Sequence, residues 1–260
     1  MFFTPKAETF HMKAEGLDAP VLVRRSPRAR RISLTVNEAR RGAVLTVPQH
    51  ASLEEAGNFL ARHFDWLQDR LDAIPKPIPF IDNAVIPLRG ELHRLSFRPG
   101  RQRRGVVWRI EPGGGRSPDH PSLCVSGAPE HAPRRLRDWL KKQARDDLSD
   151  RCTIHAETLN VRPSRITVRD QTSRWGSCSA NGALSFSWRL ILAPHFVLDY
   201  LAAHEVAHLR EMNHGKKFWA HVHTACADTD RAKAWLRKNG AQLHRYGVDA
   251  DEAAESPEFA

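Results

Sequence analysis

The first half of the chain alternates apolar and polar residues at the two-residue interval that is typical of β-strands. Residues 31–36 and 43–47 both show this alternation, and the polar stretch between them contains Gly42, which favours a hairpin. Pro48 ends the second strand because proline cannot donate to a ladder. Four more short strands are predicted, at residues 84–88, 93–97, 106–110 and 123–125. This half is therefore predicted to be β-rich.

One helix interrupts these strands, over residues 52–73. Ser52 and Glu55 have the spacing of a capping box, in which each side chain bonds the backbone amide of the other residue. Prolines at 75, 77 and 79 then predict a stiff, extended connector. The apolar residues of the helix recur at helical spacing and are expected in the core: Leu53, Ala56, Leu60, Phe64, Leu67 and Leu71.

The rest of the chain is predicted to be mainly helical around a small hairpin. A long helix is expected from about residue 134 to 159. Strands are expected at 165–169 and 183–190, linked by the segment 175–178 and an Asn-Gly turn. Pro194 begins a further helix, and two more helices follow it, the first marked by Phe218 and Trp219. The predicted fold class is α+β.

The chemical pattern with the clearest meaning is His-Glu-Val-Ala-His over residues 204–208, followed by His214. Two histidines four residues apart lie on one face of a helix, roughly 6 Å apart along its axis, so their imidazoles can bind one zinc ion. Glu205 can then act as general base on a water molecule that the metal activates. His214 can be the third ligand if the helix ends between residues 212 and 215, where Asn and Gly allow an exit. Three protein ligands leave a fourth position open, which is typical of catalytic rather than structural zinc.

Several segments around this motif carry a resemblance to a known family. They are Arg174–Ser179, Ser187–Leu190, Ala193-Pro194 and Asn213–Trp219. With the histidine motif, they resemble the YgjP-like metal-dependent hydrolases, relatives of the SprT-like and WLM metalloproteases of the short gluzincin type. The resemblance is strong over residues 170–240 and weaker over 24–72. It implies that His204, His208 and His214 bind one zinc ion and that Glu205 is the catalytic carboxylate.

The resemblance also implies a mainly helical, zincin-like metallopeptidase domain with a rim β-hairpin above the metal. The edge of such a hairpin can bind an extended peptide by strand addition. We expect Trp175 and Trp188 in the core and the backbone of Arg174–Ser179 in the cleft wall. Arg174, Arg189 and Tyr200 can each stabilise an oxyanion by residue type, and their spacing does not choose among them. The cleft candidates are Arg174, Trp175, Gly176, Ser177, Arg189 and Tyr200.

These expectations divide the chain into a β-rich region at 1–130 with the helix at 52–73, a catalytic region at 131–248, and a tail at 249–260. The boundary between the first two is expected near 126–133. The tail holds five acidic and no basic residues, so it is expected to be disordered.

Composition restricts the location and partners. At 260 residues the chain can form one large or two modest domains. It has no run of about eighteen apolar residues, so no membrane span is expected. The N-terminus has no basic segment followed by an apolar one, so no signal peptide is expected. The four cysteines are scattered without a Cys-x-x-Cys pair, which suits reduced thiols in the cytoplasm.

The net charge of +10 comes mostly from arginine. Residues 24–41 carry seven arginines and one acid, and residues 89–116 carry eight and two. These segments suit a polyanion surface, but the first has no aromatic residue and the second only Phe97 and Trp108, which does not suggest base stacking, so we favour solvated strand faces with at most weak nucleic-acid contact.

The sequence favours a zinc metallopeptidase that takes a peptide or protein substrate. One alternative is a metal-dependent nucleotide or phosphoester hydrolase, which the arginines suit, although three histidines favour zinc over magnesium. Another is a SprT-like peptidase that acts on DNA-associated proteins.

Overall fold

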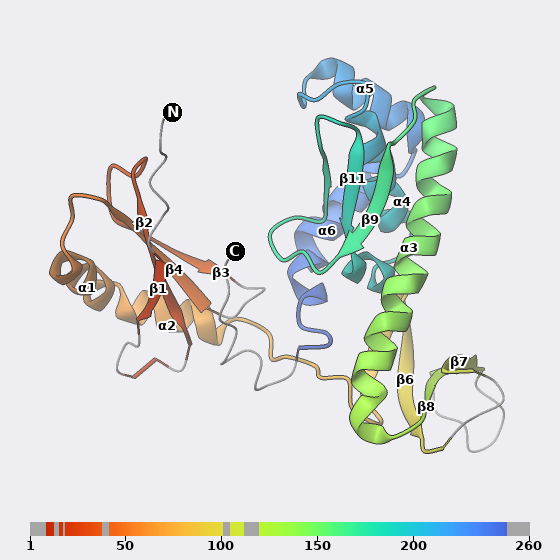
Figure 1. Ribbon diagram of the computed structural model, residues 1–260, viewed down its shortest axis with the longest axis horizontal. Coiled ribbons are helices and arrows are strands. Elements are labelled where there is room, and N and C mark those ends of the chain that lie inside the picture. Colours follow the sequence, from red (N-terminus) through yellow and green to blue (C-terminus); the bar gives the residue numbers. More distant parts are fainter. Residues whose placement is uncertain are drawn as a thin grey trace. The chain divides into compact units, whose positions relative to one another are not determined.

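The chain has an α+β fold, as the sequence predicts. It forms two compact units that divide between Lys76 and Pro77, and the second unit ends at Val248 (Figure 1). No helix in the described ranges is long and apolar enough to cross a membrane. The acidic tail expected at 249–260 lies outside those ranges. The computed structural model describes residues 9–12, 16–17, 19–37, 42–100, 105–111 and 120–248.

The first unit is built on a four-stranded sheet in the order β1-β2-β4-β3. The predicted pair is present, because β3 (Ser33–Asn37) and β4 (Gly42–Pro48) are antiparallel. Two strands that the sequence pattern did not predict complete the sheet. β2 (Val21–Ser26) is parallel to β4, and β1 (Thr9–Met12) is antiparallel to β2.

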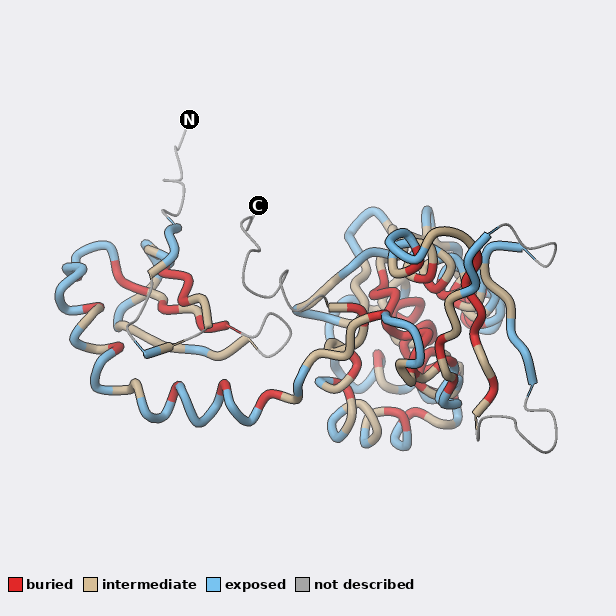
Figure 2. Tube along the Cα trace, turned by 90° about the horizontal axis from the view of Figure 1, so that it is seen from below, coloured by how far each residue is buried: buried red, intermediate tan, exposed pale blue. Residues whose placement is uncertain are grey.

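The predicted helix at 52–73 is present as two consecutive helices. The capping box of Ser52 and Glu55 begins α1 (Leu53–Arg62), and both of its hydrogen bonds are formed, at 3.0 and 2.7 Å. A break at His63 separates α1 from α2 (Phe64–Asp72). Figure 2 shows buried positions recurring at helical intervals along both helices. They belong to a core of the first unit's own and include Ala56, Leu60, Leu67 and Leu71. Leu53, which was also expected in the core, is 50% exposed because it is the first residue of α1, and Phe64 is only partly buried.

The second unit begins with a four-stranded sheet in the order β5-β6-β8-β7. All four strands lie where the alternation predicts them. β5 pairs with β6, and β7 with β8, in antiparallel fashion, whereas β6 and β8 are parallel. Their bounds are β5 (Val85–Leu88), β6 (Glu91–Arg98), β7 (Val107–Ile110) and β8 (Ser122–Ser126).

The turn between β5 and β6 ties this sheet to the segment before the histidine helix. The Arg89 amide donates to the Ile191 carbonyl oxygen at 2.7 Å, and its guanidinium pairs with Asp147 at 2.7 Å. Gly90 has a φ of +83°, and a Cβ there would lie 3.0 Å from Pro194. Glycine therefore satisfies both the backbone conformation and the close approach at this turn.

One long helix, α3 (Ala132–Thr158), runs past both sheets of the second unit (Figure 1). It contacts β7, β8 and β9, and one continuous core includes residues from Phe80 to Leu243. The boundary expected near 126–133 therefore falls inside the second unit. The strands before α3 share its core, so they do not form a domain with the first unit.

A second sheet of three strands lies against this helix, in the order β10-β11-β9. The strands are β9 (Arg165–Arg169), β10 (Gly176–Cys178) and β11 (Ala183–Ser187). The hairpin was expected between the first and last of these, but they are parallel, and the antiparallel hairpin joins β10 and β11. The chain after β9 crosses to the far edge of β11 before it turns. β11 also ends before residue 190, because Trp188–Leu192 forms a buried 3-10 turn.

The remaining helices pack around α4 (His195–Ala207), which contacts α3, α5 (Lys216–Ala225) and α6 (Thr229–Leu243). Asp199 on α4 accepts hydrogen bonds from Arg151 Nε and His155 Nε2 of α3, both at 2.6 Å. Burial raises the pKa of Asp199, but the hydrogen bonds and charges of His155 and Arg151 together lower it by more, so its pKa lies below the usual value. The pair fixes α4 to α3.

Candidate metal centre

The histidine motif lies at the end of α4, a helix that is buried on nearly every face. The sequence allowed His214 as third ligand if the helix ended between residues 212 and 215. The helix ends earlier, at Ala207, with His208 as its C-cap. The next two amides bond to carbonyls three residues back, which tightens the last turn. His208 keeps helical backbone angles and so stays one turn beyond His204. The early exit leaves a short loop that returns His214 to both of them.

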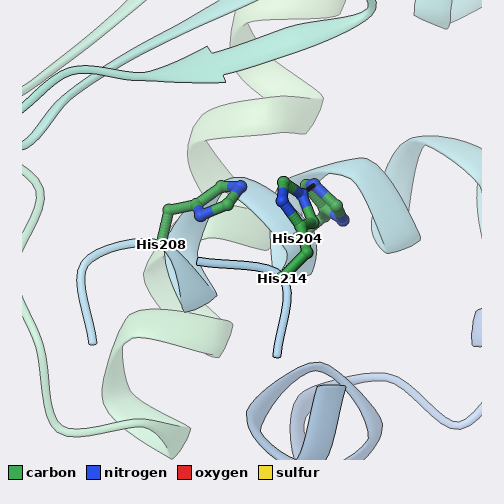
Figure 3. Close-up of side chains that lie close together, drawn as sticks. All are labelled: His204, His208 and His214. Carbon is green, nitrogen blue, oxygen red and sulfur yellow. Dashed lines mark hydrogen bonds between the residues drawn. The ribbon is translucent and has the colours of Figure 1, made fainter. Parts of the chain in front are cut away.

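Figure 3 shows the three imidazoles of His204, His208 and His214 gathered at this point. One ring nitrogen from each lies within 4.8 Å of the others. The Nε2 atoms of His204 and His214 are 3.2 Å apart. Two nitrogens that bind one tetrahedral zinc ion at roughly 2.05 Å lie about 3.3 Å apart. The donor set and its spacing therefore fit a zinc ion.

The environment keeps these imidazoles available to a metal. Burial, and then the charges of His208, His214 and Lys233, lower the pKa of His204 to about 3. Its ring is therefore neutral near pH 7, which is the form that binds metals. Phe218 forms an apolar wall, with its ring centroid 4.9, 4.5 and 4.6 Å from those of His204, His208 and His214.

Two of the three rings have a hydrogen-bond partner on the nitrogen that faces away from the others. The Nδ1 atom of His208 lies 3.2 Å from the backbone oxygen of Glu211. The Nδ1 atom of His204 lies 3.3 Å from the phenol oxygen of Tyr200, one helical turn earlier. The two Nε2 atoms are thereby left as the nitrogens that face the metal position.

Glu205 is buried beside the histidines, with 4% of its surface exposed. Burial raises the pKa of its carboxyl to about 8, and the charge of Arg174 opposes that rise. The first residue of β10 packs directly on this side chain, since a Cβ on Gly176 would lie 2.5 Å from Glu205 Oε1. The edge strand and the carboxylate are therefore in contact because residue 176 has no side chain.

The other predicted cleft residues are distributed unevenly. Trp175 stacks on His244, the C-cap residue of α6, with ring centroids 4.7 Å apart, and it packs against the core. Ser177 pairs with Ser185 within the hairpin. Arg189 is buried, forms an ion pair with Asp170 and lies over the ring of the fully buried Trp188, so its contacts are with these residues and not with the histidines.

The sequence pattern missed three neighbours of the histidines. Phe218 and Trp219 were expected only as markers of the next helix, yet the ring centroids of Trp219 and His204 lie 6.0 Å apart. The Nζ atom of Lys233, on α6, lies 4.2 Å from the Trp219 ring centroid. Phe218 lies in the first turn of the helix that begins just after His214, and this short separation is the sequence feature that could have placed its ring beside that histidine.

The model of the YgjP-like metallopeptidase domain matches residues 30–239. The chain belongs to this family. The resemblance stated from the sequence is thereby confirmed. No curated protein matches the chain. The crystal structure of the metallopeptidase zymogen of Pyrococcus abyssi abylysin is similar to the chain, with a TM-score of 0.33 and 20% sequence identity, over 39% of this chain and 99% of that chain.

The YgjP-like match begins in the first unit and ends within α6, so it includes every candidate site residue. The chain therefore has a metallopeptidase domain whose histidines form a cluster that can hold a metal ion.

Proposed function

We propose that this protein is a zinc-dependent peptidase in which His204, His208 and His214 bind one zinc ion and Glu205 is the general base. The observation that carries the proposal is the convergence of three imidazole nitrogens within 4.8 Å, next to a buried carboxylate, in a YgjP-like chain. Zinc at this position would acidify a water molecule and polarise a carbonyl group.

The protein residues supply the remaining chemistry. Glu205 takes the proton of the attacking water and delivers it to the leaving amine, and its burial shields the carboxylate from bulk solvent. The carboxylate must be ionised to act, and a divalent cation beside it favours that form. Arg174 is exposed and its charge lowers the pKa of Glu205, so Arg174 is the residue that we propose as stabiliser of a developing oxyanion.

The substrate we propose is an extended peptide. β10 is an edge strand of its sheet, and its first residue touches Glu205. A peptide that pairs with the free edge of β10 is therefore led past the carboxylate by backbone hydrogen bonds, which do not depend on its sequence.

Two variants test the proposal together. His208→Ala should lose most of the bound zinc in elemental analysis, because only two of three ligands remain. Glu205→Gln should keep one zinc ion per chain and lose peptide hydrolysis by about a hundredfold or more, because an amide cannot take the proton. Cleavage is followed by mass spectrometry on a peptide library, and a chelator should abolish it until zinc is restored. Full zinc retention by His208→Ala would overturn the ligand set, and full activity of zinc-loaded Glu205→Gln would overturn the mechanism.

A further inference from the structure

The phenol of Tyr200 is placed to act on the metal site through His204 and not on a substrate. Its oxygen lies 3.3 Å from His204 Nδ1, and the two rings meet edge to face with centroids 5.7 Å apart. Only 6% of the Tyr200 surface is exposed. Its hydroxyl is thus directed at the one imidazole nitrogen that faces away from His214.

The chemistry of imidazole gives this contact a direction. A neutral ring has one proton, and a ring that binds a metal through Nε2 must carry that proton on Nδ1. A buried N–H group without an acceptor is destabilising, because it has lost its hydrogen bond to water. His204 Nδ1–H can donate to the Tyr200 oxygen, just as His208 Nδ1–H can donate to the Glu211 carbonyl oxygen.

The two outer partners differ in one useful respect. The acceptor for His208 is a backbone carbonyl oxygen, which no substitution removes. The acceptor for His204 is a side-chain hydroxyl, and phenylalanine removes it while keeping the ring that packs against the histidine.

We propose that Tyr200 is a positioning residue of the metal site, whose phenol oxygen accepts a hydrogen bond from Nδ1–H of His204 and so holds Nε2 toward the metal. This inference rests on the proposed function, since it requires His204 to be a ligand. It also separates Tyr200 from the oxyanion stabilisers, because its hydroxyl is committed to His204 and is nearly inaccessible to a substrate carbonyl.

The experiment compares Tyr200→Phe with Tyr246→Phe, which changes the other tyrosine of the chain. Tyr246 forms an isolated bridge with Ile78 and is not part of the histidine cluster. Zinc affinity is measured by competition with a chromogenic chelator, and the metal-free melting temperature of each variant is recorded. We expect Tyr200→Phe to bind zinc about 10- to 100-fold more weakly, as is usual when an outer partner of a ligand is lost. Tyr246→Phe should bind as the native chain does.

The outcomes separate this inference from the proposed function. If the native chain binds no zinc, both fail. If the native chain binds zinc and Tyr200→Phe binds it equally well, only the positioning role fails, and a fall in kcat at that unchanged affinity would assign Tyr200 to the oxyanion. If Tyr200→Phe does not fold, the imidazole ¹H–¹⁵N spectrum of the zinc-loaded native protein decides instead. A protected proton on His204 Nδ1 supports the inference, and a metal-bound Nδ1 overturns it.

Discussion

A methyl group at position 176 would occupy the space that the Glu205 carboxyl group now fills. The Cβ of an alanine there would lie 2.5 Å from Oε1, 2.8 Å from Cγ and 2.9 Å from Cδ of Glu205. The backbone of Gly176 is not in the left-handed region, so alanine is compatible with its conformation. The three heavy atoms nearest to that methyl group all belong to Glu205, so Gly176→Ala acts first on this side chain.

The size of the effect follows from these distances. To reach an ordinary contact of 3.4 Å, the carboxylate oxygen must retreat by about 0.9 Å. Displacing a catalytic group by about 1 Å can lower the rate about a hundredfold. Overpacking of this kind also costs about 1–3 kcal/mol of stability. We therefore expect kcat to fall about a hundredfold, with a modest loss of unfolding free energy.

The assay is steady-state kinetics on a peptide that the native protein cleaves, with zinc content measured in the same samples. Zinc content should be unchanged, because the substitution does not touch the histidines. Gly240→Ala is the matched control: its Cβ would meet Trp175 at an ordinary 3.5 Å, so activity should stay native while the helix gains up to about 1 kcal/mol. If Gly176→Ala retains kcat within about threefold, the contact does not position Glu205 and the reasoning is refuted.

Two further predictions concern stability and partners. Asp199→Asn should lower the unfolding free energy by about 2 kcal/mol at pH 7, because it weakens charge-assisted hydrogen bonds from Arg151 and His155. Since the pKa of Asp199 is lower in the folded than in the unfolded chain, its stabilising contribution is present at neutral pH and is lost as the pH falls through the folded pKa. Urea titrations should therefore show a difference in unfolding free energy between variant and native chain that disappears only below pH 3.8. Equal unfolding free energies at pH 7 would contradict this account. DNA binding measured by fluorescence anisotropy at physiological salt should have a Kd weaker than about 1 μM, because Arg25 already bonds the backbone oxygens of Pro48, Gln49 and Ala51. Tighter binding that falls when three exposed arginines of the same segment, Arg28, Arg30 and Arg31, are replaced would instead indicate a nucleic-acid surface.

The local features of the fold could be predicted from the sequence because they depend on neighbouring residues. The capping box at Ser52 and the strands of the β5–β8 sheet follow from spacing along the chain. β2 was missed because its buried run Val21–Val23 is continuous and its arginines follow directly, so it has no alternation to detect. The parallel pairings of β2 with β4 and of β9 with β11 join strands that are not consecutive, and no local pattern specifies them.

The same distinction holds at the candidate site. The three histidines could be brought together from spacing alone, since two share a helix face and the third follows closely. The contact of Gly176 with Glu205 joins distant segments, so it required the fold. The division of the chain into units also depends on contacts between distant segments. Strand patterns reveal that a sheet exists, but they do not reveal that the β5–β8 sheet packs on α3.

Because α3 packs against both sheets of the second unit, we expect neither sheet to unfold locally without disturbing the other. Opening the β5–β8 sheet would expose one end of a helix whose other end holds α4 through Asp199. Amide protons of β6 and α4 are therefore expected to exchange with solvent through the same cooperative opening. A destabilising substitution in the β5–β8 sheet would therefore affect the histidine cluster by raising the frequency at which the whole second unit unfolds, although the substituted residue does not contact the histidines.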